Sequence, residues 1–303
     1  MLKPTPNFSV IIPVHDDWGP LAGCMESLKQ QNGNREYEVI VVDDGSRDAA
    51  PASIRQYGEI FPLSIFRQPH SGIARARNWG IQNSNGPVLL FTDADCRLDP
   101  DCLSALAETV TSATQHHYFQ LRITGQLSNL LGRAEELRHL AIQKQVLQTD
   151  GRIRYLNTSG FAVRRTAIDT SRDLFDPTAL RSEDTLLLTN LIQKGELPLF
   201  VTEAAVRHSI EMSFWECIRK DIRVATLESR TFERISAKGV QVRMNNWERF
   251  AMLGSTWEAS AQPSIGRAAW LVLALRQATQ RFISVLYRFV PSRFSRQSSR
   301  NVP

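Results

Sequence analysis

Three short acidic sequences each stand where an apolar, strand-like run ends. They are His-Asp-Asp (15–17), Asp-Asp-Gly-Ser (43–46) and Asp-Ala-Asp (93–95). In an open parallel sheet, ligands bind at the carboxyl ends of the strands, so we expect these sequences to meet. Carboxylates held close together repel one another unless a cation joins them. Their oxygens suit Mg²⁺ or Mn²⁺, so the clusters predict a divalent metal site.

The elements that must position these acids alternate along the chain. Apolar, β-rich runs occupy residues 8–14, 37–46, 63–66 and 87–95, and helical spacing occupies residues 17–31 and 73–82. Apolar strands that alternate with helices indicate a doubly wound, mostly parallel α/β sheet. Asp99-Pro100 predicts a helix over 100–110, with Asp99 as its N-cap. Further elements are expected at 118–124 (strand), 127–147 (helix), 154–165 (strand or hairpin) and 185–195 (helix).

Composition excludes several classes of protein. The chain has 303 residues, of which 42% are hydrophobic and 22% charged, which excludes wholesale disorder, collagen and a coiled coil. The formal net charge is +5, but residues 264–303 contain seven arginines and no acid. The rest of the chain is therefore close to neutral, which argues against a nucleic-acid partner. The four cysteines form no Cys-x-x-Cys pair, so we expect reduced thiols.

The sequence predicts neither a targeting segment nor a helix that spans a membrane. The first residues contain no apolar segment before the expected first strand, so no signal peptide is predicted. No run of about 18 uncharged apolar residues occurs. We therefore expect a cytoplasmic protein, with peripheral contact at the inner face of the cell membrane as a hypothesis that rests on the C-terminal residues.

Taken together and in order, the motifs resemble family 2 glycosyltransferases of the GT-A fold. The matching sequences are VIIPVHDD (10–17), YEVIVVDDGSRD (37–48), GIARARNWGI (72–81), VLLFTDADCRLDPDCL (88–103), SGFAVRR (159–165), LFDPTALRSEDTLLL (174–188) and VRHS (206–209). The resemblance covers about residues 7–210. It implies a GT-A sheet followed by a C-terminal helical extension, and a metal-dependent, inverting enzyme that uses a nucleotide sugar.

The resemblance also implies roles for individual residues. The metal would be bound by Asp95, with Asp93 and His208. Asp184 would be the general base, next to Glu183. The residues implied in nucleotide-sugar binding are Pro13, Val14, His15, Asp16, Asp43, Asp44, Arg77, Asn78, Asp93 and Gly160.

Simpler explanations exist for several of these residues. Asp-Asp-Gly-Ser (43–46) is also a turn sequence, and Arg77 could be a surface charge on a helix. Glu183 and Asp184 could be acids that stabilise a helix N-terminus. His208 could be an ordinary histidine at the end of a strand.

The expected reaction is transfer of one sugar, with a UDP-sugar favoured as donor, to a glycan or lipid-linked acceptor in envelope glycan, exopolysaccharide or glycolipid synthesis. Processive relatives carry Gln-x-x-Arg-Trp, and no Arg-Trp pair occurs in this sequence. Two alternatives are a non-catalytic nucleotide-sugar-binding scaffold and a nucleotidyltransferase, although the acidic loop after the first strand argues against the latter. A dinucleotide-dependent oxidoreductase is disfavoured, because no Gly-x-Gly-x-x-Gly follows the first strand.

We expect four regions along the chain: a nucleotide-sugar-binding half (1–110), an acceptor-binding half (111–212), a helical region (213–290) and a disordered tail (291–303). The helical region should contain a basic amphipathic helix over 268–290. At 100° per residue, its apolar face includes Leu271, Val272, Leu275 and Phe282, and its polar face includes Arg276, Gln277, Gln280 and Arg281. Such a helix could dock on the protein's own core or lie on a membrane surface.

Overall fold

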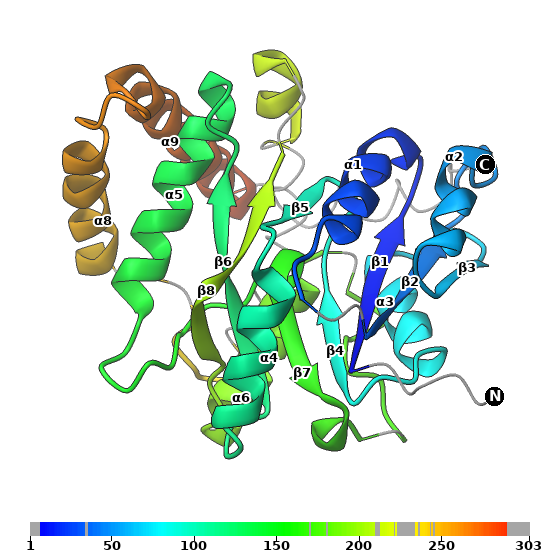
Figure 1. Cartoon of the computed structure of the whole chain (residues 1–303). Helices are drawn as coiled ribbons and strands as arrows, with labels where there is room; N and C mark the ends of the chain where they lie inside the picture. Colours follow the sequence, from blue (N-terminus) through cyan, green and yellow to red (C-terminus); the bar gives the residue numbers. More distant parts are fainter. Residues whose placement is uncertain are drawn as a thin grey trace.

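The computed structural model describes residues 7–33, 36–169, 171–179, 181–209, 213–220, 222, 234–235, 237–242, 244 and 246–289. They build one eight-stranded sheet with helices on both faces and an added helical layer at one end (Figure 1). The strand order is β3-β2-β1-β4-β7-β6-β8-β5. The predicted tail at 291–303 lies outside the described residues.

The first four strands form the parallel part of the sheet that sequence analysis predicted. They are β1 (Phe8–Val14), β2 (Tyr37–Asp43), β3 (Leu63–Arg67) and β4 (Val88–Phe91). Every residue of β1, β2 and β4 is buried, which explains why these strands read as continuous apolar runs. Their parallel pairing brings their carboxyl ends to one edge of the sheet.

The remaining strands mix both directions. They are β5 (Cys96–Leu98), β6 (Tyr118–Gly125), β7 (Phe161–Arg164) and β8 (Leu199–His208). The short strand β7 runs antiparallel to β4 and β6, and β6 runs parallel to β8. β5 pairs antiparallel with β8 and places Cys96 opposite His208. This pairing joins the loop after β4 to the end of β8.

Two hydrophobic cores fill the space between the sheet and its helices. Helices α1 (Trp18–Lys29), α2 (Ala52–Arg55) and α4 (Cys102–Ser112) contribute to one core. Helices α3 (Ile73–Gln82) and α6 (Glu183–Lys194) contribute to the other. Short 3₁₀ turns cover Gln56–Glu59, Thr158–Gly160 and Arg165–Ala167.

A third helical layer lies beyond β6 and β8 (Figure 1). It consists of α5 (Leu130–Val146), α8 (Asn246–Ala259) and α9 (Arg267–Phe289). The predicted C-terminal helical extension is therefore confirmed. Among the described residues, no helix is long and apolar enough to cross a bilayer.

Candidate active site

The Asp-Asp-Gly-Ser sequence after β2 forms a tight turn with buried acids. The backbone N–H of Ser46 donates to Asp43 Oδ1 at 2.7 Å, and Arg67 Nε lies 3.4 Å from Asp43 Oδ2. Gly45 has a φ of +76°, and a Cβ there would lie 2.6 Å from the backbone nitrogen of His70. Glycine is therefore required at this close approach. These contacts account for Asp43 as a turn residue, and its contact with a base or ribose stays a prediction.

Asp44 connects this turn to the loop that leads into α3. Its Oδ1 accepts hydrogen bonds from the Ser71 backbone N–H at 2.8 Å and the Gln68 side chain at 2.7 Å. Its Oδ2 accepts from the Gly72 backbone N–H at 2.9 Å. Asp44 therefore fixes the shape of the loop beside the strand ends. Direct binding of a nucleotide by Asp44 stays a prediction.

The end of β1 leads from two buried residues, Pro13 and Val14, to the exposed His15. The His15 Nδ1 lies 2.9 Å from the carbonyl oxygen of Asp44, and its ring centroid lies 4.3 Å from that of His70. The two rings are tilted by 31° to each other, and their exposed faces at the strand ends are ones on which a planar ring can stack. The sequence motif named His15 but gave no sign of His70 as its partner.

Asp16 adopts an uncommon backbone conformation, with a φ of +60°. Its carboxylate accepts hydrogen bonds from Arg47, at 2.8 Å from the backbone N–H and 3.0 Å from Nε. Its own N–H donates to Ser46 Oγ at 2.9 Å. These bonds hold the loop after β1 against the loop after β2. They also hold Asp16 in a backbone conformation that few non-glycine residues adopt.

Asp93, Asp95 and Cys96 form a cluster whose candidate ligand atoms all lie within 4.8 Å of one another. The carboxylate side chains are partly exposed, whereas Cys96 is fully buried. Burial, with the charges of Asp95 and Asp93, raises the pKa of the Cys96 thiol well above its ordinary value. A protonated thiol is a poor ligand, and hard divalent cations prefer oxygen. The two carboxylates are therefore the better ligands.

His208 lies beside this cluster, because its Nε2 is 3.1 Å from Asp95 Oδ2. Burial alone would lower the pKa of His208, but the hydrogen bond to Asp95 and its charge outweigh burial and raise it. The same bond lowers the pKa of Asp95 against the effect of burial. The carboxylate suits Mn²⁺ or Mg²⁺, whereas an imidazole beside it suits a transition metal better than Mg²⁺.

Lys220 brings positive charge to the same place and was not found from the sequence. It lies in a helical segment at 214–220, and its charge acts on Asp17, Asp95 and His208. Burial and the charge of Asp95 raise the pKa of Asp17. The cluster therefore combines two signs of charge, as a site for a metal-bound diphosphate would.

Arg77 is buried between two carboxylates and is only 1% exposed. Its Nη2 donates to Asp93 Oδ1 at 2.7 Å, and its Nη1 donates to Glu183 Oε1 at 2.5 Å. The explanation of Arg77 as a surface charge is therefore wrong. One guanidinium joins the Asp-x-Asp sequence to the Glu-Asp pair, although 106 residues separate Arg77 from Glu183.

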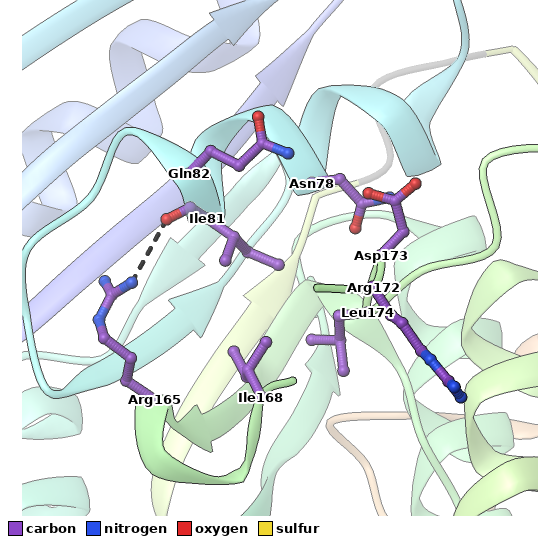
Figure 2. A pocket seen from close by; sticks show the side chains of 8 residues that line it. All are labelled: Asn78, Ile81, Gln82, Arg165, Ile168, Arg172, Asp173 and Leu174. Carbon is purple, nitrogen blue, oxygen red and sulfur yellow. Dashed lines mark hydrogen bonds between the residues drawn. The ribbon is translucent and has the colours of Figure 1, made fainter. Parts of the chain in front are cut away.

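Asn78 also has internal partners. Its side chain donates to the carbonyl oxygen of Phe175 at 2.7 Å and accepts from the Phe175 N–H at 3.0 Å. It lines a cavity of about 270 Å³ together with Ile81, Gln82, Arg165, Ile168, Arg172, Asp173 and Leu174 (Figure 2). Asn78 is the one residue predicted for donor binding that lines this cavity. The cavity is therefore distinct from the acidic cluster at the strand ends.

Glu183 and Asp184 begin α6, directly after Ser182, whose φ is +62°. Asp184 Oδ1 accepts from the Thr185 N–H at 2.6 Å and the Thr185 hydroxyl at 3.1 Å. Burial, then the neighbouring charge of Glu183, raises the pKa of Asp184 to about 7. A carboxylate with this pKa can accept a proton near neutral pH.

Gly160 has a packing role in the structure. A Cβ at this position would lie 2.7 Å from Ile123 Cδ1 and 3.3 Å from Leu121 Cβ. Its approach to donor or acceptor stays a prediction. The preceding residue, Ser159, donates its hydroxyl to Asp93 Oδ2 at 2.7 Å. Asp93 is thus held from both sides, by Arg77 and by Ser159, and the sequence gave no sign of this second contact.

Known proteins share sequence similarity with this chain. The uncharacterized glycosyltransferase YfnE of Bacillus subtilis is 39% identical over 88 residues, which are 29% of this chain and 22% of that protein. The poly(ribitol-phosphate) beta-N-acetylglucosaminyltransferase TarS of Staphylococcus aureus is 27% identical over 186 residues, 60% of this chain and 32% of TarS. The chain therefore spans about a third or less of the length of these relatives.

Solved structures show the same fold. The mannosyltransferase PcManGT of Pyrobaculum calidifontis, in complex with GDP-Man and Mn²⁺, aligns with a TM-score of 0.64 at 14% identity, over 94% of this chain and 87% of that one. Residues 1–349 of S. aureus TarS, in complex with UDP, align with a TM-score of 0.56 at 18% identity, over 93% and 91%. The fold is thus that of the GT-A glycosyltransferases. The model of glycosyl transferase family 2 matches residues 9–171, more than half of the sequence, so the chain belongs to that family.

Proposed function

We propose that the protein transfers one sugar from a nucleotide sugar, with a UDP-sugar favoured, to an acceptor hydroxyl with inversion at the anomeric carbon. The observation that carries the proposal is the connected set Asp95–His208, Asp93 and Glu183, with Arg77 between Asp93 and Glu183. In this set, the candidate metal ligands lie on one side of the guanidinium, and Glu183, the residue before the candidate base Asp184, lies on the other.

Asp95, Asp93 and His208 would hold a divalent cation, which supplies charge neutralisation for a diphosphate leaving group. Arg77 and Ser159 fix both oxygens of Asp93, so this carboxylate is already oriented before a donor binds. Lys220 adds a cation beside Asp95 that would attract a phosphate oxygen. The exposed rings of His15 and His70 would receive the base.

Asp184 would take the proton from the acceptor hydroxyl. Its raised pKa makes the ionised carboxylate a stronger base than an exposed aspartate at the same pH. Glu183 cannot readily play this part, because its Oε1 is already bound to Arg77. Attack from the side of Asp184, opposite the leaving diphosphate, gives inversion.

The acceptor we favour is a hydroxyl of a cell-envelope glycan, an exopolysaccharide or a lipid-linked glycan. TarS, by its name, acts on poly(ribitol phosphate), which supports a polymer of the envelope as the acceptor class. A scaffold that only binds nucleotide sugar is the second candidate, but it would not need a partly buried aspartate of raised pKa.

Slow hydrolysis of a UDP-sugar tests the chemistry without a known acceptor. Proton NMR would follow the anomer released from a panel of UDP-sugars with Mn²⁺, by wild type and by Asp184→Asn. We expect the anomer opposite to that of the donor, and a loss of about a hundredfold or more in rate in the variant. Release of the same anomer as the donor would contradict the proposed inversion. No turnover with intact UDP binding would favour the scaffold.

A further inference from the structure

Helix α9 docks on the protein through a narrow face that differs from the apolar face calculated from the sequence. Ala269 and Leu273 are buried against Ala134 and Leu137 of α5. Arg276 is also buried, with its Nη1 2.6 Å from Glu135 Oε1. The helix wheel places Arg276 on the polar face. In the structure Arg276 faces the protein instead, because it pairs with the buried Glu135.

The calculated apolar face is therefore left uncovered over much of its width. Leu271, Leu275 and Phe282 are 62%, 53% and 66% exposed, and Ala278 between them is also exposed. At 100° per residue these four side chains fall within roughly 60° of arc, along about 16 Å of helix. We call these four residues the α9 stripe.

The charged residues of α9 itself are all of one sign. Arg281 is exposed next to Phe282, and Arg267 lies one turn before Leu271. From Arg267 to the last residue, the sequence contains seven arginines and no acid. Trp257 of α8, 47% exposed, lies under the Arg267 guanidinium at 3.7 Å and against the ring of Trp270 at 5.0 Å.

We infer that the α9 stripe is a docking surface for an anionic lipid bilayer. Exposed leucine and phenylalanine flanked by arginine and tryptophan are what an interfacial helix presents to headgroups and acyl chains. A second copy of this chain is a poorer fit, because two stripes face to face would bring the arginines of both copies together. Docking through α9 would also suit a lipid-linked acceptor, although the inference does not depend on the reaction.

Vesicle flotation of the full chain tests this inference. The probes are vesicles of phosphatidylcholine alone and of phosphatidylcholine mixed with phosphatidylglycerol, each at low and high salt. We expect wild type to float with the anionic vesicles, and less so at high salt. The combined variant Leu271→Gln/Leu275→Gln/Phe282→Gln should lower the partition coefficient by about tenfold or more. The matched control, Ile60→Gln/Leu127→Gln, removes two exposed apolar side chains elsewhere and should float like wild type.

Thermal unfolding of each variant, which should match wild type, separates loss of docking from loss of folding. Two results would overturn the inference: wild type that stays unbound with anionic vesicles, or a stripe variant that floats as well as wild type. Light scattering, which measures the oligomeric state, could give a third result that overturns the inference. A wild-type dimer that the stripe variant converts to monomer, without flotation of either, would assign the α9 stripe to self-association. UDP binding measured on the same samples reports on the donor site separately.

Discussion

Replacement of Asp184 by asparagine should make the protein more stable and inactive at the same time. The folded state raises the pKa of this carboxyl from 3.8 to about 7, by burial and by the charge of Glu183. The sign follows from linkage: stability is complete below the unfolded pKa and falls as the pH rises towards the folded pKa, at which the loss levels off. The Asp184→Asn variant would avoid that loss, because an amide has no charge to bury.

The size of the effect follows from the shift. About three pKa units at 1.36 kcal/mol each give an upper limit of about 4 kcal/mol at pH 8. The unfavourable interaction is shared with Glu183, and the Asp184 side chain is partly exposed to solvent. We therefore expect Asp184→Asn to raise the free energy of unfolding by about 1–3 kcal/mol. Below about pH 3, where Asp184 is protonated in the folded state and largely so in the unfolded one, the difference should approach zero.

Urea unfolding followed by tryptophan fluorescence at pH 4, 6 and 8 measures this difference. Glu203→Gln, an exposed carboxylate on β8, is the matched control and should change stability little at any of these pH values. Activity of Asp184→Asn should fall by roughly 10²–10⁴. An Asp184→Asn variant no more stable than wild type at pH 8, or one that keeps activity within tenfold, would refute the reasoning.

Three further changes probe the rest of the site. Arg77→Met should destabilise the fold by about 3–5 kcal/mol in urea unfolding, because it leaves two carboxylates without their shared cation, and Arg77→Lys should cost less; equal stability of both with wild type would contradict the role given to Arg77. Gly160→Ala should cost about 1–3 kcal/mol because its Cβ would press on Ile123, whereas Gly254→Ala, with open space around it, should be neutral or slightly stabilising. Mn²⁺ affinity, measured by calorimetry, should rise with pH above 6.5 as His208 loses its proton, and this dependence should flatten in His208→Ala.

The parallel half of the fold could be predicted because its strands are buried on both faces. β1 spans residues 8–14 as expected, and the run at 37–46 predicted β2, which ends at Asp43 where the turn begins. The expected N-cap at Asp99 is wrong, because α4 begins at Cys102 with Asp101 in the N-cap position. Asp99 instead follows β5, a three-residue strand too short to show a periodic pattern, and pairs with Arg207 at 3.1 Å.

The site was predicted as a set of positions, but its internal contacts were not. The acidic residues could be predicted from the polar sequences at the strand ends, because the carboxyl ends of the strands meet in this topology. Nothing in the sequence indicated that Arg77 would join Asp93 to Glu183, because such pairs depend on how distant segments pack. The same limit applies to α9: a helix wheel finds the apolar face, but it cannot show that Arg276 would find Glu135 and turn a different face inward.

The most direct test of the central claim is thermal unfolding with UDP, GDP, CDP and dTDP, each with and without Mn²⁺, for wild type and Asp95→Ala. A nucleotide at 100 times its dissociation constant should add about 2.7 kcal/mol of stability. We predict stabilisation by one nucleotide, with UDP favoured, that requires Mn²⁺ and is lost in Asp95→Ala. Stabilisation that is equal in Asp95→Ala, or the absence of stabilisation by any of the four, would contradict a metal-dependent donor site at the ends of β4 and β8.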